Sequence, residues 1–209
     1  MIEEQSVGTF LADLASSAPT PGGGSVAAIA AATGAAMVAM VARLTEGRPS
    51  FEAVSERMRD VAEHADEERA ALLDLADRDA EAFDAVMASF KLPKVTDDEK
   101  AARLAAIQAA FAGAAEVPME VARRASALLD EAAEIIATGN SDAASDGMSG
   151  AAMLHAGVLC ALANVSINAG SLKDEALAER LRGQAAELSM SADQALDAAR
   201  AAFAERTAS

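Results

Sequence analysis

Alanine supplies 57 of the 209 residues, and no other feature restricts the possible folds of this chain so strongly. Alanine is the best helix former, and it lacks the branched or aromatic side chain that favours strands. The chain has no Trp, no Tyr and only 6 Phe, although 52% of its residues are apolar and can form a core. We therefore expect an all-α protein, in which residues 1–209 form a single-domain bundle of long antiparallel helices. A β-sandwich, a barrel or an α/β sheet is disfavoured.

The composition is strongly acidic, because 17 basic side chains stand against 33 acidic ones and give a net charge of −16. Nucleic acid and anionic membranes require dense Lys and Arg, so neither is expected as a partner. The single cysteine, Cys160, excludes an intramolecular disulfide, and the two histidines, His64 and His155, form no zinc pattern, so we expect no metal. The first five residues are acidic where a secretory signal would be basic, which favours a cytoplasmic protein.

Two long segments, Pro19 to Ala42 and Gly147 to Leu172, carry no Asp, Glu, Lys or Arg. Each is long enough to cross a bilayer. Both are rich in small residues that let helices approach closely, and the second also contains two Asn. We interpret them as central helices buried by neighbouring helices or by a second subunit, with a membrane span as the weaker alternative.

Apolar residues at helical spacing predict a series of helices over about 6–14, 25–44, 50–90, 97–138, 145–168 and 174–203. Ser25 is expected to cap the second of these, and Thr96 with Glu99 forms a capping box before the fourth. Pro118 predicts a kink or a break inside the fourth helix. Gly139 is expected to end that helix in the left-handed conformation.

The segment Pro21-Gly22-Gly23-Gly24-Ser25 is the first candidate binding site. Free amides and the positive end of the helix dipole can hold a carboxylate or a phosphate at such a helix start. It is not a Walker loop, because no Gly-Lys-Ser/Thr follows, and no strand precedes it to support a dinucleotide fingerprint. A tight turn with a capping serine explains the same residues without a ligand.

Asp79 is the second candidate. The neighbouring Asp77, Glu81 and Asp84 share one face of the predicted third helix, whereas Asp79 is turned away from them, towards apolar positions. A carboxylate on an apolar face has a raised pKa and is suited to proton transfer. The alternative is an acidic face that serves only solvation.

The third group consists of Asn140, Ser145 and Asp146 near the start of the fifth helix, and of Asn164 and Asn168 one turn apart within it. Buried amides need hydrogen-bond partners, so these asparagines either bond to neighbouring backbone or bind a ligand.

Three further residues receive simpler interpretations. His155 is read as a core histidine and Cys160 as a packing residue. Lys94, in the loop around Pro93, is read as an exposed cation that could attract an anionic tail.

Taken in order, these segments resemble the cyclodeaminase/cyclohydrolase family of folate one-carbon enzymes. This family includes the cyclodeaminase half of formiminotransferase-cyclodeaminase and stand-alone methenyltetrahydrofolate cyclohydrolases. The resemblance covers nearly the whole chain and rests on Pro19-Thr20-Pro21-Gly22-Gly23-Gly24-Ser25, Asp79-Ala80-Glu81-Ala82-Phe83, Val86-Met87, Leu92-Pro93-Lys94, Val117-Pro118, Gly139-Asn140, Ser145-Asp146, Asn164-Val165 and Ile167-Asn168.

The resemblance implies an all-α fold, an obligate homodimer and a folate site in a cleft near the subunit interface. It implies that Asp79 is the proton-transfer group. It further implies that the substrate-binding or site-shaping positions are Pro21, Gly22, Gly23, Gly24, Ser25, Lys94, Asn140, Ser145, Asp146, Asn164 and Asn168. The folate, with or without a polyglutamate tail, is then the substrate, and no separate cofactor or metal is expected.

The expected activity is that of a methenyltetrahydrofolate cyclohydrolase, which converts 5,10-methenyltetrahydrofolate to 10-formyltetrahydrofolate. A carboxylate can stabilise the delocalised cation of this substrate and assist the addition of water. The alternative is a 5-formiminotetrahydrofolate cyclodeaminase, in which N10 attacks the formimino carbon and ammonia leaves. The chain carries no formiminotransferase domain, which favours the hydrolase. A non-catalytic helical scaffold, dimeric but unable to bind folate, is the third hypothesis.

Overall fold

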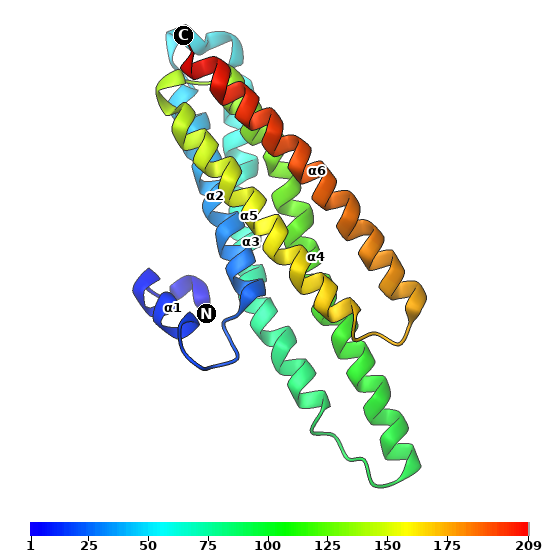
Figure 1. Cartoon of the computed structure of the whole chain (residues 1–209). Coiled ribbons are helices and arrows are strands. Elements are labelled where there is room, and N and C mark those ends of the chain that lie inside the picture. Colours follow the sequence, from blue (N-terminus) through cyan, green and yellow to red (C-terminus); the bar gives the residue numbers. More distant parts are fainter. Residues whose placement is uncertain (209) are drawn as a thin grey trace.

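The computed structural model describes residues 1–208, and within them it contains six α-helices, three short 3-10 segments and no strand. The helices are α1 Val7–Leu14, α2 Gly23–Thr45, α3 Ser55–Ser89, α4 Asp97–Thr138, α5 Ala144–Ala169 and α6 Glu175–Thr207, and the 3-10 segments are Ile2–Glu4, Pro49–Val54 and Ser141–Ala143. The predicted all-α fold is confirmed (Figure 1).

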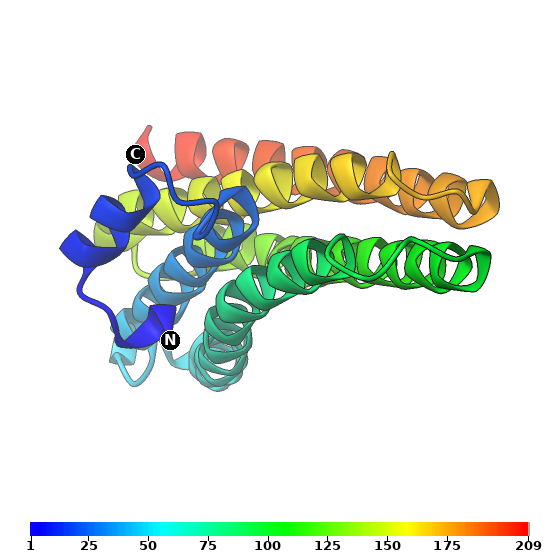
Figure 2. The ribbon, with the colours of Figure 1, turned by 90° about the horizontal axis from the view of Figure 1, so that it is seen from below.

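Helices α2 and α5 form the centre of the bundle. Helix α5 packs against α2 and α4, α3 packs against α2 and α4, and α6 lies along α4 and α5 (Figures 1 and 2). Helices α2 and α5 run antiparallel, and small residues let them approach closely. A Cβ atom added to Gly34 would lie 2.6 Å from Leu154, and one added to Gly157 would lie 2.8 Å from Ala31.

The two long uncharged segments become these two central helices. Helix α2 and the segment Ser141–Ala169 are both long and apolar enough to span a membrane by length and composition. The bundle accounts for the apolarity of their inner sides, because Ala31, Val38, Leu154 and Val158 are fully buried in its core.

Two helix starts match the sequence prediction and two differ from it. The capping box of Thr96 and Glu99 is formed, and Asp174 caps α6. Helix α2 begins earlier than predicted, at Gly23, and Gly22 is its N-cap residue, so the capping role predicted for Ser25 is wrong. The region predicted to open the third helix at Ser50 forms a 3-10 segment, and α3 begins only at Ser55.

Two predictions about the ends and continuity of α4 fail. The break predicted as one outcome of Pro118 is wrong, because α4 is continuous through this residue; Pro118 and its neighbours are buried, and packing offsets the lost hydrogen bond. The kink given as the alternative stays a prediction. Gly139 follows α4 in an extended conformation, with φ −83° and ψ −165°, and not in the left-handed one. A glycine is needed here because neighbouring atoms approach closely: a Cβ at position 139 would lie 2.5 Å from the carbonyl oxygen of Ile135 and 3.0 Å from Oγ1 of Thr45.

Candidate active site

A pocket of about 350 Å³ opens where the start of α2 meets α3, α4 and the end of α5. This volume lies within the range typical of small-molecule sites. Among the described residues that line the pocket, Asp79 is the only ionisable one. The full wall consists of Pro19, Thr20, Gly22, Gly23, Gly24, Asp79, Ala82, Phe83, Val86, Phe111, Ala114, Asn164, Ile167 and Asn168.

The carboxylate of Asp79 lies against the first turn of α2. A Cβ atom on Gly24 would lie 2.0 Å from Asp79 Oδ1, so a residue without a side chain is needed for the carboxylate to reach this position. The buried hydroxyl of Ser25 donates to Asp79 Oδ2 at 3.1 Å and shares its hydrogen with the carbonyl oxygen of Ala76, also at 3.1 Å. The backbone N–H of Ser25 donates to the same carboxylate. Ser25 therefore holds Asp79 in place from behind the pocket wall.

Opposing effects set the acidity of Asp79. Burial in the apolar wall raises the pKa of its carboxyl group, because the charged form loses hydration there. The hydrogen bonds from the hydroxyl and the amide of Ser25 lower the pKa, but burial is the larger effect. No Lys, Arg or His stands among the lining residues. A cationic ligand would therefore meet a carboxylate that has no competing cation beside it.

Asn164 and Asn168 lie one turn apart on α5 and both line the pocket. The side-chain amide of Asn168 donates to the carbonyl oxygen of Ala114 at 2.8 Å, and that of Asn164 donates to the carbonyl oxygen of Cys160 at 2.9 Å. Within the described residues, the side-chain oxygen of each accepts no hydrogen bond. The backbone contacts orient both amides and leave their oxygens available to a ligand.

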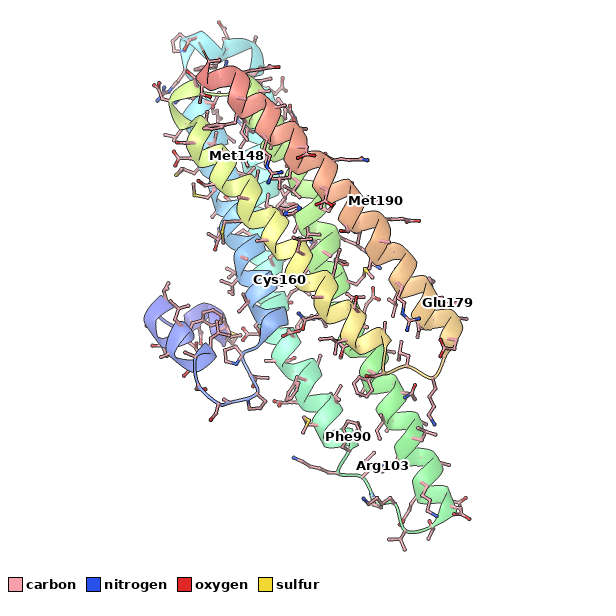
Figure 3. All side chains as sticks on the ribbon, viewed as in Figure 1. Phe90, Arg103, Met148, Cys160, Glu179 and Met190 are labelled. Atoms are coloured by element: carbon pink, nitrogen blue, oxygen red, sulfur yellow. The ribbon has the colours of Figure 1, made fainter. Side chains whose placement is uncertain are left out.

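Aromatic residues form a part of the wall that reasoning from sequence did not assign to a site. Phe83 and Phe111 both line the pocket. Phe111 contacts the ring of Phe90 edge-on, with centroids 6.1 Å apart, and the guanidinium carbon of Arg103 lies 5.7 Å from the centroid of the Phe90 ring. Phe90 and Arg103 meet at the far end of the α3–α4 pair (Figure 3). Phe111 was predicted only as an apolar helix position, although the scarcity of aromatic residues was a signal that could have marked it.

The remaining predicted site residues do not line this pocket within one protomer. Pro21 and Ser25 lie in the same segment but outside the wall, and Lys94 is exposed in the α3–α4 connection. The N–H of Asn140 donates to Oγ1 of Thr45, the last residue of α2.

Thr45 lies roughly 30 Å from Gly24 at about 1.5 Å per helical residue. Asn140 therefore lies at the opposite end of the bundle, together with Ser145 and Asp146, which occupy the first turn of α5.

The other residues with reactive side chains lie elsewhere. His155 is half-buried and pairs with Asp193 at 2.7 Å. Cys160 is exposed, so the packing role predicted for it is wrong within the protomer. Across residues 1–208, no group of three or more His, Cys, Asp and Glu side chains is arranged to hold a metal ion.

Comparison with known proteins gives consistent matches. A family model described as formiminotransferase-cyclodeaminase matches residues 6–187. The methenyltetrahydrofolate cyclohydrolase of Methylorubrum extorquens is 43% identical over 179 residues, which are 86% of each chain. The formimidoyltransferase-cyclodeaminase of Rattus norvegicus is 35% identical over 88% of this chain, which spans only 34% of that longer protein. The crystal structure of formiminotetrahydrofolate cyclodeaminase from Thermotoga maritima superposes with a TM-score of 0.88 and 30% identity, over 98% of both chains.

Proposed function

The chain belongs to the formiminotransferase-cyclodeaminase family, and from this premise we propose that it is a methenyltetrahydrofolate cyclohydrolase. The observation that carries the proposal is the pocket, which presents one carboxylate, Asp79, in an apolar and aromatic wall without a neighbouring cation. Such a wall suits a flat, delocalised cation, because the carboxylate stabilises its charge and the rings of Phe83 and Phe111 can face it. 5,10-Methenyltetrahydrofolate carries a cation of this kind between N5 and N10.

In the proposed reaction, water attacks the one-carbon centre of the bound cation while Asp79 takes a proton from it. The bond between this carbon and N5 then breaks, and Asp79 returns its proton to N5. The proton of the adduct's hydroxyl group leaves to solvent as the formyl carbonyl forms. The reaction consumes one water, gives 10-formyltetrahydrofolate and releases one proton.

The other residues of the pocket position the reactants. We assign Ser25 to hold Asp79, and Asn164 and Asn168 to bind the polar edge of the folate through their side-chain oxygens. The glycines of the α2 start let the ligand approach the helix N-terminus. No step is assigned to Asn140, Ser145 or Asp146, and no cofactor other than the folate substrate takes part.

A cyclodeaminase activity is the second candidate, favoured by the close superposition on the Thermotoga maritima enzyme. In that reaction N10 attacks the formimino carbon, ammonia leaves, and Asp79 would transfer the protons. The discriminating assay follows methenyltetrahydrofolate by its near-ultraviolet absorbance. Decay faster than the enzyme-free blank supports the hydrolase. A rise in absorbance from 5-formiminotetrahydrofolate, without such decay, supports the deaminase. If neither change is observed, the scaffold hypothesis remains.

We also propose that the enzyme is a cytoplasmic homodimer whose subunits meet through an uncharged surface, here called the α2–α5 face. Helices α2 and α5 pack side by side, and apart from Arg43, which pairs with Asp66 of α3, their exposed outer residues carry no charge. We define this face by ten of the uncharged exposed residues: Thr33, Ala36, Met40 and Leu44 of α2, and Ser149, Ala152, Leu159, Cys160, Ala163 and Ile167 of α5. Two chains that each carry a net charge of −16 repel each other, and this face is where they meet with the least repulsion.

We further propose that Lys94 attracts the glutamate tail of a polyglutamylated folate. Lys94 is exposed on the α3–α4 connection, shortly after the pocket residue Val86 in sequence. The Lys94→Ala variant is expected to raise the KM for a polyglutamylated substrate more than that for the monoglutamate. Lys100 is the matched control, since its ammonium group already pairs with Asp97 at 2.8 Å. Equal losses for both substrates in Lys94→Ala would contradict this assignment.

A further inference from the structure

Helix α1 is the one described helix that contributes no residue to the main apolar core. Figures 1 and 2 show it standing beside the bundle, joined to the start of α2 by residues 15–22. Its eight residues are too few for a stable helix in water, because helix nucleation is costly and short helices depend on packing. Within the protomer α1 buries only Phe10, so its other apolar residues point to a further packing partner outside the protomer.

Phe10 is buried in the protomer, but the neighbouring apolar positions Val7 and Leu11 of α1 are open to solvent. Val7 is 76% exposed and Leu11 is 54% exposed, and their spacing of four residues places them on the same side of the helix. The only charged residue of α1, Asp13, lies on another side. Val7 and Leu11 thus form an uncharged ridge that is free to pack on another surface.

The α2–α5 face offers the matching surface. It carries the exposed apolar side chains Met40, Leu44, Leu159 and Ile167, and the charge of Arg43 beside them is paired with Asp66. In contrast, most ion pairs of the protomer lie on α3, α4 and α6. Because the chain has a net charge of −16, a second copy can place an apolar element on this face with far less repulsion than elsewhere.

We propose that α1 docks on a second copy of this chain, with Val7 and Leu11 packed against the partner's α2–α5 face. The two copies thereby exchange their α1 helices. This inference rests on the homodimer proposed above and adds to it the segment that joins the subunits.

The exchange would also complete the substrate pocket. Pro19, Thr20 and Gly22 line the pocket and lie directly between α1 and α2. When α1 is docked, this segment is held at both ends, by the partner on one side and by α2 on the other. When α1 is released, this part of the wall loses one of its two anchors, so the subunit alone would bind substrate more weakly.

The test compares Leu11→Asp with Ala12→Asp in the full-length protein. Both changes add one carboxylate to adjacent exposed positions of α1, but only Leu11 lies on the apolar ridge. Sedimentation velocity over a dilution series gives the dimer dissociation constant, and circular dichroism verifies the helical fold. We expect Leu11→Asp to raise this constant about 100-fold, because burial of an unpaired carboxylate is costly, and Ala12→Asp to leave it within about two-fold. At protein concentrations low enough for Leu11→Asp to be monomeric, its KM should be higher than that of the wild-type dimer.

Equal dissociation constants for the two variants would overturn the proposal, as would a wild-type chain that is monomeric at all concentrations. If Leu11→Asp unfolds, the milder double variant Val7→Ser with Leu11→Ser gives the same comparison. Loss of the dimer in a chain that never turns over a folate would uphold α1 exchange and refute the proposed function. If the chain turns over the folate but Leu11→Asp dimerises as the wild type does, the proposed function stands and the α1 exchange is refuted.

Discussion

Two properties of the Asp79 carboxylate have opposite effects on its use as a catalytic base. Its hydrogen bonds with Ser25 hold it in a fixed orientation, which benefits a catalytic base, whereas its burial disfavours the charged form that the base requires. Replacement by Asn keeps the size and one acceptor oxygen but removes the proton-transfer group. Asp79→Asn is expected to lower kcat about 10²–10⁴-fold, the usual contribution of such a group, in the methenyltetrahydrofolate absorbance assay.

Asp84→Asn is the matched control, since Asp84 is exposed on the same helix and outside the pocket. Its turnover should equal that of the wild type. Full activity of Asp79→Asn would remove this residue from the reaction.

The stability of Asp79→Asn should change in the opposite direction to its activity. Burial raises the pKa of Asp79, so the folded chain keeps this proton to a higher pH than the unfolded chain does. Stability therefore falls as pH rises through this window, and at neutral pH the ionised carboxylate destabilises the fold. We expect Asp79→Asn to melt at a higher temperature than the wild type at neutral pH. The difference should vanish below about pH 4, where Asp79 is protonated in both states.

The pH dependence of turnover should carry the same signature. A base must be deprotonated, so activity falls on the acid side of its pKa, and burial moves this acid limb above the ordinary range of an aspartate. A bound cationic substrate favours the carboxylate and lowers its pKa again. The acid limb of kcat should therefore lie at lower pH than that of kcat/KM, as measured by initial rates over a pH series. Coincident limbs would mean that Asp79 does not face the substrate's charge.

At the level of single residues, sequence reasoning located Asp79 but misread Ser25. The helical phase of Asp79 differs from that of the other carboxylates of α3 and made it a candidate, whereas its proton-transfer role came only from the family resemblance. Ser25 was read as a helix cap because Ser before an apolar run often caps. Its actual partners, Asp79 and Ala76, lie more than fifty residues away in sequence, so no local pattern could reveal them.

Among the elements, the contact between α2 and α5 depends on glycines that exclude side chains. Gly34→Ala would place a Cβ within 2.8 Å of the backbone of both Gly150 and Leu154, where neither helix can yield easily. We expect this variant to lose about 1–3 kcal/mol of unfolding free energy in a urea titration. Gly183 in α6 is the opposite case, because a Cβ there meets nothing within 4 Å. Gly183→Ala should gain about 0.5–1 kcal/mol from the better helix former.

The order of these two variants tests the packing directly. If both were stabilised, α2 and α5 would be farther apart in solution than the contact distances require. If both were destabilised, the helical environment of Gly183 would be more crowded than the open surface found in α6.

Sequence predicted the elements better than their ends. The helical spacing of apolar residues is repeated many times in each helix, so it identified α2 to α6 despite local exceptions. Helix ends depend on single residues and on what lies beside them. Gly139 is glycine because Thr45, from another helix, lies within 3.0 Å of where its Cβ would be, and Pro118 is tolerated because its surroundings are buried. Both facts belong to tertiary packing, which the local sequence does not record.

For the whole molecule, the distribution of charge links the fold to assembly. The uncharged segments predict helices buried by neighbours or by a second subunit, and neighbouring helices of the protomer bury one side of α2 and α5. The outer side stays exposed, and its charged residue, Arg43, is paired with Asp66. Composition alone could not distinguish the buried side of these helices from the exposed side, because alanine occupies both.

The salt dependence of assembly follows from this charge distribution. Two subunits of net charge −16 repel each other over a distance set by the Debye length, which shrinks from about 30 Å at 0.01 M salt to about 8 Å at 0.15 M. The Arg43–Asp66 ion pair beside the α2–α5 face joins two helices of one subunit, so screening between subunits should act mainly on the repulsion. We expect the dimer dissociation constant, measured by sedimentation velocity, to fall about ten-fold over this range of sodium chloride. Sulfate would be unsuitable, because it strengthens apolar burial in any interface. A dissociation constant that rose with salt would require attractive ion pairs between the subunits, and would place the interface on the charged surfaces of α3, α4 or α6.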